Sequence, residues 1–216
     1  TFRYNTFYTP KETTKPTGNG SAGSAVAVYS YIDKTFFEYN KTSCRGVWQF
    51  GAEAVTPAMF FQSDTVIFNY NVLDSTGFMA FDNTTYLEAW NNTIISHASS
   101  NEYLVNTAKM NNGSWNNNIV LVPIGVSPFN GTNTLTKSNN INESSAYAGW
   151  NATYGFTSSL TGDYTPLSGS SLIDQAASTY GRLSEDIKGD AVPYNALYDI
   201  GAYEYGGTSS PPAYVS

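Results

Sequence analysis

Short apolar runs with a period of two residues recur along the chain and are separated by polar bends. The clearest runs are residues 25–29, 65–70, 86–90 and 119–123. Alternation of apolar and polar side chains predicts β-strands, because successive residues of a strand point to opposite faces. Only residues 173–179 suggest a short helical turn. The pattern therefore predicts an all-β protein built from many short strands.

One phrase, an aromatic residue followed by Asn, returns next to several of these strands. Its Asn residues are Asn5, Asn40, Asn71, Asn91, Asn116 and Asn139. The last three spacings, 20, 25 and 23 residues, match one rung of a parallel β-helix, which contains three short strands and three bends. The first two spacings, 35 and 31 residues, leave room for long loops near 9–24 and 42–57. We predict a right-handed parallel β-helix of about six rungs, with long loops in its first half.

Stacking these phrases rung on rung assigns a structural role to each position. Asn suits a bend between strands because it tolerates the left-handed conformation, and its amide can pair with the Asn of the next rung. We therefore expect these residues to form an Asn ladder rather than a ligand site. An inward aromatic column would contain Tyr4, Tyr39, Tyr70, Trp90 and Trp115, with Phe2, Phe37 and Phe68 on the same face. An outward, mostly polar column would contain Arg3, Glu38, Asn69, Ala89 and Ser114.

The composition excludes several classes of protein. The 216 residues carry a net charge of −7, and their ten Lys and Arg residues form no patch, which disfavours a nucleic-acid partner. A single cysteine, Cys44, excludes an intrachain disulfide. No run of 18 apolar residues is present, so no membrane span is predicted. Charged residues make up only 12%, so uncharged polar residues must cover the surface, as is typical of extracellular all-β proteins.

The ends of the chain suggest how it is organised. It has no initiator Met and no signal peptide, and it begins within a repeat phrase at Thr1. We interpret it as the C-terminal part of a longer array or as a processed chain. Residues 1–205 are predicted to form one β-helix domain, and residues 206–216 a flexible tail rich in Gly, Ser and Pro.

Three segments near the C-terminus carry a family resemblance: Pro166–Asp174, Asp186–Gly189 and Tyr198–Tyr205. They resemble the end of pectate-lyase-like, right-handed parallel β-helix proteins, many of which are secreted or surface proteins of the choice-of-anchor type. Together with the Asn phrases, the resemblance covers most of residues 60–205. It implies an extracellular or cell-surface location and a closing strand at 199–205 that packs on the last rung. The Arg that the family usually has after its Asp-x-x-Gly motif is replaced here by Ala191-Val192-Pro193.

Two groups of carboxylates are candidates for chemistry. Asp33 and Asp64 each precede a phrase Asn by seven residues, so they would stack about 5 Å apart on adjacent rungs. Such a pair could bind Ca²⁺, act as acid and nucleophile on a glycan, or simply face solvent at a bend. Asp186 and Asp190, with Asp199, form a second group that could hold a metal or cap the fold. Ca²⁺ is the only cofactor that the pattern suggests.

Asn-x-Ser/Thr sequons are candidate glycosylation sites on a secreted chain. Eight occur, at Asn19, Asn40, Asn83, Asn91, Asn112, Asn130, Asn142 and Asn151.

Two functions remain open. The first is a non-catalytic structural or adhesive β-helix protein, or a filament subunit, which binds itself or sister subunits because an open rung edge recruits other strands. The alternative is a polysaccharide lyase, glycoside hydrolase or carbohydrate-binding module on the same fold. We favour the first, because His97 is the only histidine and the basic residues near strand columns, Arg3, Lys34 and Lys41, do not align into a catalytic group.

Overall fold

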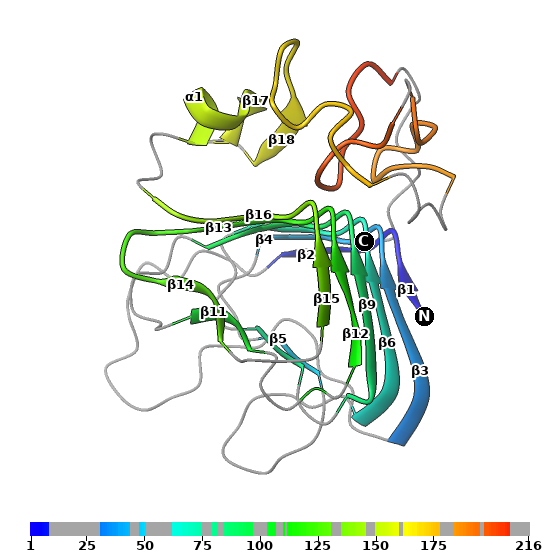
Figure 1. Ribbon diagram of the computed structural model, residues 1–216. Helices are drawn as coiled ribbons and strands as arrows, with labels where there is room; N and C mark the ends of the chain where they lie inside the picture. Colours follow the sequence, from blue (N-terminus) through cyan, green and yellow to red (C-terminus); the bar gives the residue numbers. More distant parts are fainter. Residues whose placement is uncertain are drawn as a thin grey trace.

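The computed structural model describes residues 1–8, 31–43, 48–50, 62–74, 79–81, 84–96, 103–106, 110, 112–130, 135–145, 150–159, 162–177, 184–194 and 197–207. Sixteen strands of these residues form three sheets, in which every strand pairs in parallel with its neighbours. The predicted parallel β-helix is therefore confirmed (Figure 1).

Each of the six rungs contributes one strand to each of the first two sheets, and the four middle rungs also contribute one strand each to the third sheet. The first sheet contains β1 (Phe2–Arg3), β3 (Tyr31–Glu38), β6 (Gln62–Asn69), β9 (Tyr86–Trp90), β12 (Asn112–Asn116) and β15 (Leu135–Ser138). The second contains β2 (Thr6–Tyr8), β4 (Lys41–Ser43), β7 (Val72–Asp74), β10 (Thr93–Ile95), β13 (Ile119–Val122) and β16 (Ile141–Ser144). The third contains β5 (Trp48–Phe50), β8 (Met79–Phe81), β11 (Tyr103–Asn106) and β14 (Ser127–Asn130). The six-stranded sheets give the six rungs that the sequence predicts.

The predicted strands are matched where the structure describes them, whereas the described residues of the second predicted loop, at 42–57, lie in β4 and β5. The runs at 65–70, 86–90 and 119–123 coincide with β6, β9 and β13. The run at 25–29 and the loop at 9–24 lie outside the described residues, and the second long loop contains β5 at 48–50. None of the described helices is long and apolar enough to cross a membrane.

The interior of the coil is filled by aromatic and aliphatic side chains that alternate with outward residues along each strand. Phe37 stacks on Phe68 of the next rung at 5.3 Å between ring centroids. Phe68 meets Phe81 edge to face at 5.8 Å, and Phe81 meets Trp115 at 6.3 Å. All four side chains are fully buried. Ring pairs of this kind contribute about 0.5–1.5 kcal/mol each beyond the burial of their area.

Every rung passes from the first sheet to the second through one left-handed residue. These residues are Tyr4, Tyr39, Tyr70, Asn91, Asn117 and Asn139, with φ between 51° and 57°. The left-handed conformation brings Cβ close to the backbone, and Asn tolerates it better than most residues. The residue that follows each of them is Asn and points into the coil, where it forms the ladder.

The Asn ladder consists of Asn5, Asn40, Asn71, Asn92, Asn118 and Asn140. Each Asn except Asn140, in the last rung, donates its backbone N–H and its Nδ2–H to Oδ1 of the Asn in the next rung, for example from Asn92 to Asn118 at 2.9 and 2.8 Å. The side chain also donates to a carbonyl of the preceding rung, as Asn92 Nδ2 does to Phe68 O at 2.7 Å. Amides that would be costly to bury alone are thus paired along the stack.

The predicted ladder was right for its first three members and wrong for Asn91, Asn116 and Asn139. Asn91 and Asn139 are left-handed bend residues one position earlier, and Asn116 lies two positions before the ladder residue Asn118. The error arose from aligning Trp90 and Trp115 with the bend tyrosines. In the observed register, Trp115 pairs with Ala89, which pairs with Phe68, whereas Trp90 pairs with Asn69.

The predicted inward column of bend tyrosines is also wrong, although the rings do stack. Tyr4 lies 4.8 Å from Tyr39, and Tyr39 lies 5.8 Å from Tyr70. They pack outside the coil, against Val192 and Tyr198. Strand alternation does not extend through a left-handed residue, so the side chain there turns outward while the next residue turns in.

Residues 150–207, here called the C-terminal segment, cover the outer face of the second sheet (Figure 1). The segment includes the five-residue helix α1 (Trp150–Tyr154) and an antiparallel pair, β17 (Phe156–Ser158) and β18 (Asp163–Pro166). Its apolar side chains bury Val72, Ile95, Ile119 and Leu121 of the sheet. The outer face of the second sheet is thus a second core.

The closing strand that the family resemblance implied at 199–205 is not formed. This stretch has irregular backbone and crosses the bends of several rungs instead of packing on the last one. Gly201 N donates to Asn117 O at 2.8 Å, and Ala202 N donates to Thr93 Oγ1 at 3.1 Å. Gly201 has φ 102°, and an added Cβ would lie 2.6 Å from Ile119 Cδ1, so glycine is required for this close crossing.

Candidate functional site

The first rung forms one end of the stack, and its strands pair on one side only. β1 pairs with β3 and β2 pairs with β4, and no described strand lies beyond them. Such an edge presents backbone donors and acceptors to whatever lies next to it. The bend between the two strands, Tyr4 and Asn5, carries the side chains that begin the tyrosine stack and the Asn ladder.

Asn5 is the one ladder residue whose acceptor is unused in the described part of the chain. Its backbone N–H and Nδ2 donate to Asn40 Oδ1 at 3.1 and 3.0 Å, and Nδ2 also donates to Arg3 O at 3.0 Å. In each of the five later rungs, Oδ1 receives two hydrogen bonds from the Asn of the rung before. The ladder is therefore directional, and its open acceptor lies at the first rung.

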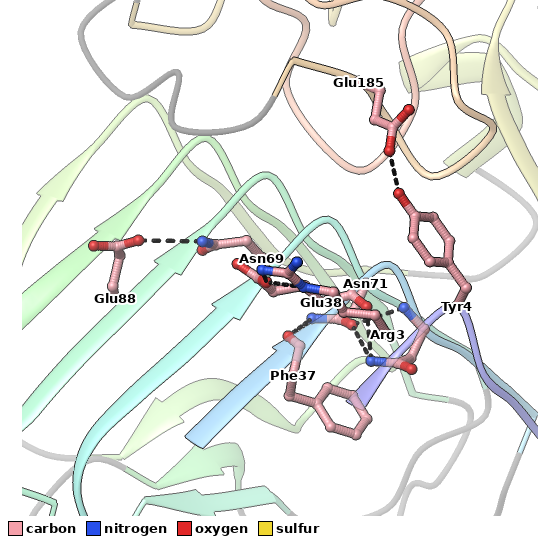
Figure 2. A network of polar contacts seen from close by, with 9 residues as sticks. Arg3, Tyr4, Phe37, Glu38, Asn69, Asn71, Glu88 and Glu185 are labelled. Carbon is pink, nitrogen blue, oxygen red and sulfur yellow. Dashed lines mark hydrogen bonds and ion pairs between the residues drawn. The ribbon is translucent and has the colours of Figure 1, made fainter. Parts of the chain in front are cut away.

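A row of polar side chains runs from the first rung across the outer face of the first sheet (Figure 2). Arg3 Nε donates to Glu38 Oε2 at 2.7 Å, and the Glu38 side chain is only 3% exposed although that of Arg3 is 45% exposed. Further along the face, Asn69 Nδ2 donates to Glu88 Oε1 at 3.2 Å, and Glu88 is also buried. Figure 2 also shows Tyr4 of the first bend donating to Glu185 of the C-terminal segment.

Aromatic rings accompany this row on the same outer face. Phe36, Tyr86 and Trp90 occupy outward positions and are half-buried. The Arg3 guanidinium lies 5.8 Å from the Phe36 ring centroid, and Lys34 Nζ lies 4.9 Å from it. Trp90 Nε1 donates to Ser114 Oγ at 2.8 Å. Asn116 is fully buried on this face with neither amide atom hydrogen-bonded, which nothing in the structure explains.

The last rung differs from the first at its inward positions. Lys137 pairs with Trp115 and thus continues the column of Phe37, Phe68 and Ala89, which fills the coil. It is exposed, and its Nζ lies 4.7 Å from the Phe129 ring centroid at the end of the core. Partial burial lowers the pKa of Lys137 from its ordinary value.

Asp33 and Asp64 lie side by side on β3 and β6, as the sequence predicted. Their neighbours on both sides are paired, Ile32 with Ser63 and Lys34 with Thr65, and both aspartates are exposed. Among the described residues, no group of three His, Cys, Asp or Glu side chains could hold a metal ion. The Ca²⁺ site stays a prediction.

The carboxylates near the C-terminus are buried and accept backbone N–H groups. Asp186 accepts from Lys188 and Asp190 at 2.7 and 2.9 Å and from Glu204 at 2.9 Å. Asp199 accepts from the N–H groups of residues 174 and 205 at 2.8 and 2.7 Å, and Asp190 is buried beside these groups. These hydrogen bonds join separate parts of the C-terminal segment to one another. This fits the alternative in which the predicted carboxylate cluster caps the fold.

Burial also shifts the acidity of this cluster. Desolvation, together with the neighbouring Asp199 charge, raises the pKa of Glu204 to about 8. Desolvation likewise raises the pKa of Asp199 to about 6 and that of Asp186 above its usual range, although their backbone hydrogen bonds act in the opposite direction. Burial in the C-terminal segment thus raises the pKa of all three carboxyl groups above their ordinary values.

The sequons fall into different environments. Asn40 and Asn91 are buried and hydrogen-bonded, so a glycan on either is incompatible with this fold. Asn112 and Asn142 are exposed and leave room for a glycan. The Asn130 and Asn151 side chains, and all of Asn19 and Asn83, lie outside the described part, as do His97 and Cys44.

The fold places the protein in the class of parallel β-solenoids. No protein-family model, no curated protein and no solved structure matches the chain. Its function must therefore be argued from its own residues.

Sequence reasoning placed Asn5 in the ladder but missed its open acceptor, and it missed Lys137 at an inward position of the last rung. Lys137 could have been found if the rungs had been aligned on the Asn pair of each late bend rather than on the tryptophans. That alignment places Lys137 in the column of Phe37 and Phe68.

Proposed function

We propose that this chain is a non-catalytic structural or adhesive β-helix protein that docks a further rung, supplied by a sister subunit, on its first rung. The observation that carries the proposal is the open Oδ1 of Asn5 at the receiving end of a directional ladder. A docked parallel rung with Asn at its bend would supply the two donors that every later ladder residue receives. The edges of β1 and β2 would supply the backbone pairing.

The location and kinship that we propose agree with this role. The uncharged polar surface and the exposed sequons Asn112 and Asn142 support an extracellular or cell-surface glycoprotein. The C-terminal motifs support kinship with pectate-lyase-like β-helix proteins of the surface or adhesin type. A filament subunit is one form of this function, in which the first rung of this chain receives the rung of a neighbouring sister subunit.

A covalently attached extra rung tests whether the first rung accepts one. A copy of residues 31–43 is joined ahead of Thr1 through a flexible Gly/Ser linker of about 20 residues, which spans roughly 25 Å. We expect Tm to rise relative to the unextended chain. Each kcal/mol of added stability corresponds to about 2–4 °C for a domain of this size.

Two controls make the result specific. The first replaces the bend Asn of the added copy by Ala, which removes the side-chain donor for Asn5 Oδ1 and leaves only the backbone N–H. The second is Thr6→Pro, because the N–H at this position in later rungs donates to the preceding rung, as Lys41 N does to Asn5 O at 2.9 Å. Proline at an edge removes that donor without breaking the pairing within the coil. Equal Tm values for all extended chains would contradict the proposal.

A carbohydrate-active or carbohydrate-binding function is the second candidate. It is favoured by the outer face of the first sheet, where Phe36, Tyr86 and Trp90 accompany the buried carboxylates Glu38 and Glu88. Aromatic rings stack on sugars, and paired carboxylates hydrolyse glycosides. The test is incubation with acidic and neutral polysaccharides, followed by assays for new reducing ends, unsaturated ends and binding. Activity that Glu88→Gln abolishes would favour this candidate.

A further inference from the structure

The two ends of the coil are complementary at the bend. At the last rung, the N–H and Nδ2 of Asn140 occupy the positions from which every earlier Asn donates to the next Oδ1, and Nδ2 donates only to Trp115 O at 2.6 Å. At the first rung, Asn5 Oδ1 lacks those two donors in the described part of the chain. With respect to the bend alone, a second copy of the chain could therefore stack head to tail on the first.

The two ends are not complementary at the inward columns. The column of Phe37, Phe68, Ala89 and Trp115 ends in Lys137. The neighbouring column of Leu73, Ile94 and Val120 ends in Asn142. At the other end, Phe2 and Phe7 hold the same register positions, paired with Phe37 and Thr42. Head-to-tail stacking would therefore place Lys137 and Asn142 in register with residues 2 and 7 of the second copy.

A lysine at this position opposes stacking strongly. In the described residues, no carboxylate lies within ion-pair distance of Lys137, and its ammonium contacts only the face of Phe129. Phe129 itself packs on Trp115 at 5.0 Å, at the end of the core. A copy docked here would remove water from an unpaired charge, which is costly. Lysine at an inward position of an edge strand is one of the devices by which native sheets avoid edge-to-edge association.

We propose that Lys137 ends the coil by preventing a second copy of this chain from docking on its last rung. The rung that stacks on the first rung is then not the last rung of a second copy, but a β-helical rung with Asn at the ladder position and an apolar residue in the column of Lys137. This inference rests on the proposed function, since it assigns the partner of the first rung. The first rung of the coil can then accept a further rung, whereas its last rung cannot dock on the first rung of a second copy.

Sedimentation velocity over a range of concentrations tests the inference with the full chain. Lys137→Met keeps the length of the side chain and removes its charge, and Lys34→Met is the matched control on an exposed, outward residue of β3. We expect the native chain and Lys34→Met to remain monomeric, and the weight-average mass of Lys137→Met to rise at least about twofold with concentration. Adding Thr6→Pro to Lys137→Met should restore the monomer, because it blocks the first rung.

Each other outcome overturns the inference. A native chain that associates as strongly as Lys137→Met would show that Lys137 is no barrier. If Lys137→Met and the double variant Lys137→Met/Asn142→Leu both stay folded and monomeric, the inward columns do not control stacking. Oligomers that survive Thr6→Pro would arise from another surface. The covalent-rung experiment does not involve residue 137, so the proposed function can succeed where this inference fails.

Discussion

The first three bends and the last three hold the same C-terminal segment in different ways. All six have the same left-handed backbone, but the first three carry Tyr and the last three Asn. The tyrosines stack and form an apolar contact with Val192 and Tyr198. The asparagines donate or accept hydrogen bonds: Asn91 Nδ2 to Asp199 O, Ala177 N to Asn117 Oδ1, and Asn139 Nδ2 to Gln175 O. One backbone column thus supports two kinds of docking.

The repeat determines the residue at the ladder position but not the residue at the bend position. The ladder position is Asn in all six rungs because its amide is buried and must be paired on both sides. The bend position lies outside the coil, so its side chain is selected by the segment that covers it. The left-handed backbone costs Tyr more than Asn, and stacking with burial of the rings offsets that cost in the early rungs.

Replacing a tyrosine of the early bends should have the largest effect on this comparison. Tyr70 is 3% exposed and packs against Tyr39, so Tyr70→Ala should lower the free energy of unfolding by about 3–5 kcal/mol. Chemical denaturation monitored by circular dichroism measures this change.

Tyr70→Phe is the matched control. The Tyr70 hydroxyl is buried without a hydrogen-bond partner, so its removal should be neutral or slightly stabilising. A loss of stability in Tyr70→Phe close to that in Tyr70→Ala would show that the hydroxyl, not the stacked ring, holds the C-terminal segment.

Replacing an asparagine of the late bends should have a smaller effect. Asn117→Gly keeps the left-handed backbone accessible and removes the hydrogen bonds to Ala177 N and Asn91 Oδ1, at 3.0 and 3.3 Å. We expect a loss of about 1–3 kcal/mol, since both contacts are buried or partly buried. Hydrogen exchange should show faster exchange at Ala177 in particular.

Asn139→Gly provides the control for the backbone change. Asn139 has nearly the same φ as Asn117, 51° against 57°, but it is exposed at the end of the coil. Water can replace its hydrogen bond to Gln175 O, so we expect a loss well below that of Asn117→Gly. Equal losses for the two variants would attribute the effect to the backbone instead of the side chain.

The sequence predicted the coil better than it predicted what surrounds it. Period-two strands and the spacing of Asn phrases depend on local chemistry, which explains why the fold and the positions of Asn5, Asn40 and Asn71 were predicted. Trp90 and Trp115 were wrongly aligned with the bend tyrosines because an aromatic residue suits an inward, an outward or a bend position equally well. The covering of the second sheet depends on contacts over about a hundred residues of chain, as between Asn91 and Asp199, and no local pattern predicts them.

The pH dependence of stability distinguishes the C-terminal segment from the coil. Burial raises the pKa of Glu204 to about 8, so the folded protein favours the protonated carboxyl. The unfolded chain loses that proton near the ordinary pKa, about 4.3. Between these values the folded state binds more protons, so stability should fall as pH rises from about 4.5 to about 8 and level off above. Asp199, with its pKa raised to about 6, adds to the lower part of this range.

Thermal unfolding between pH 5 and 9 measures this slope, and Glu204→Gln is the variant that should flatten it. Gln keeps an oxygen that can accept from Tyr194 N or Asp199 N, the donors that Glu204 accepts from at 3.2 and 3.3 Å. Its amide can therefore lower the overall stability, but the amide does not titrate, so the slope rather than the level is the test. Asn92→Ala, in the ladder, should lower Tm equally at all pH values because no titratable group accepts its hydrogen bonds. If Glu204→Gln retains the full native slope, the pH dependence arises elsewhere and the Glu204 carboxyl does not contribute to it.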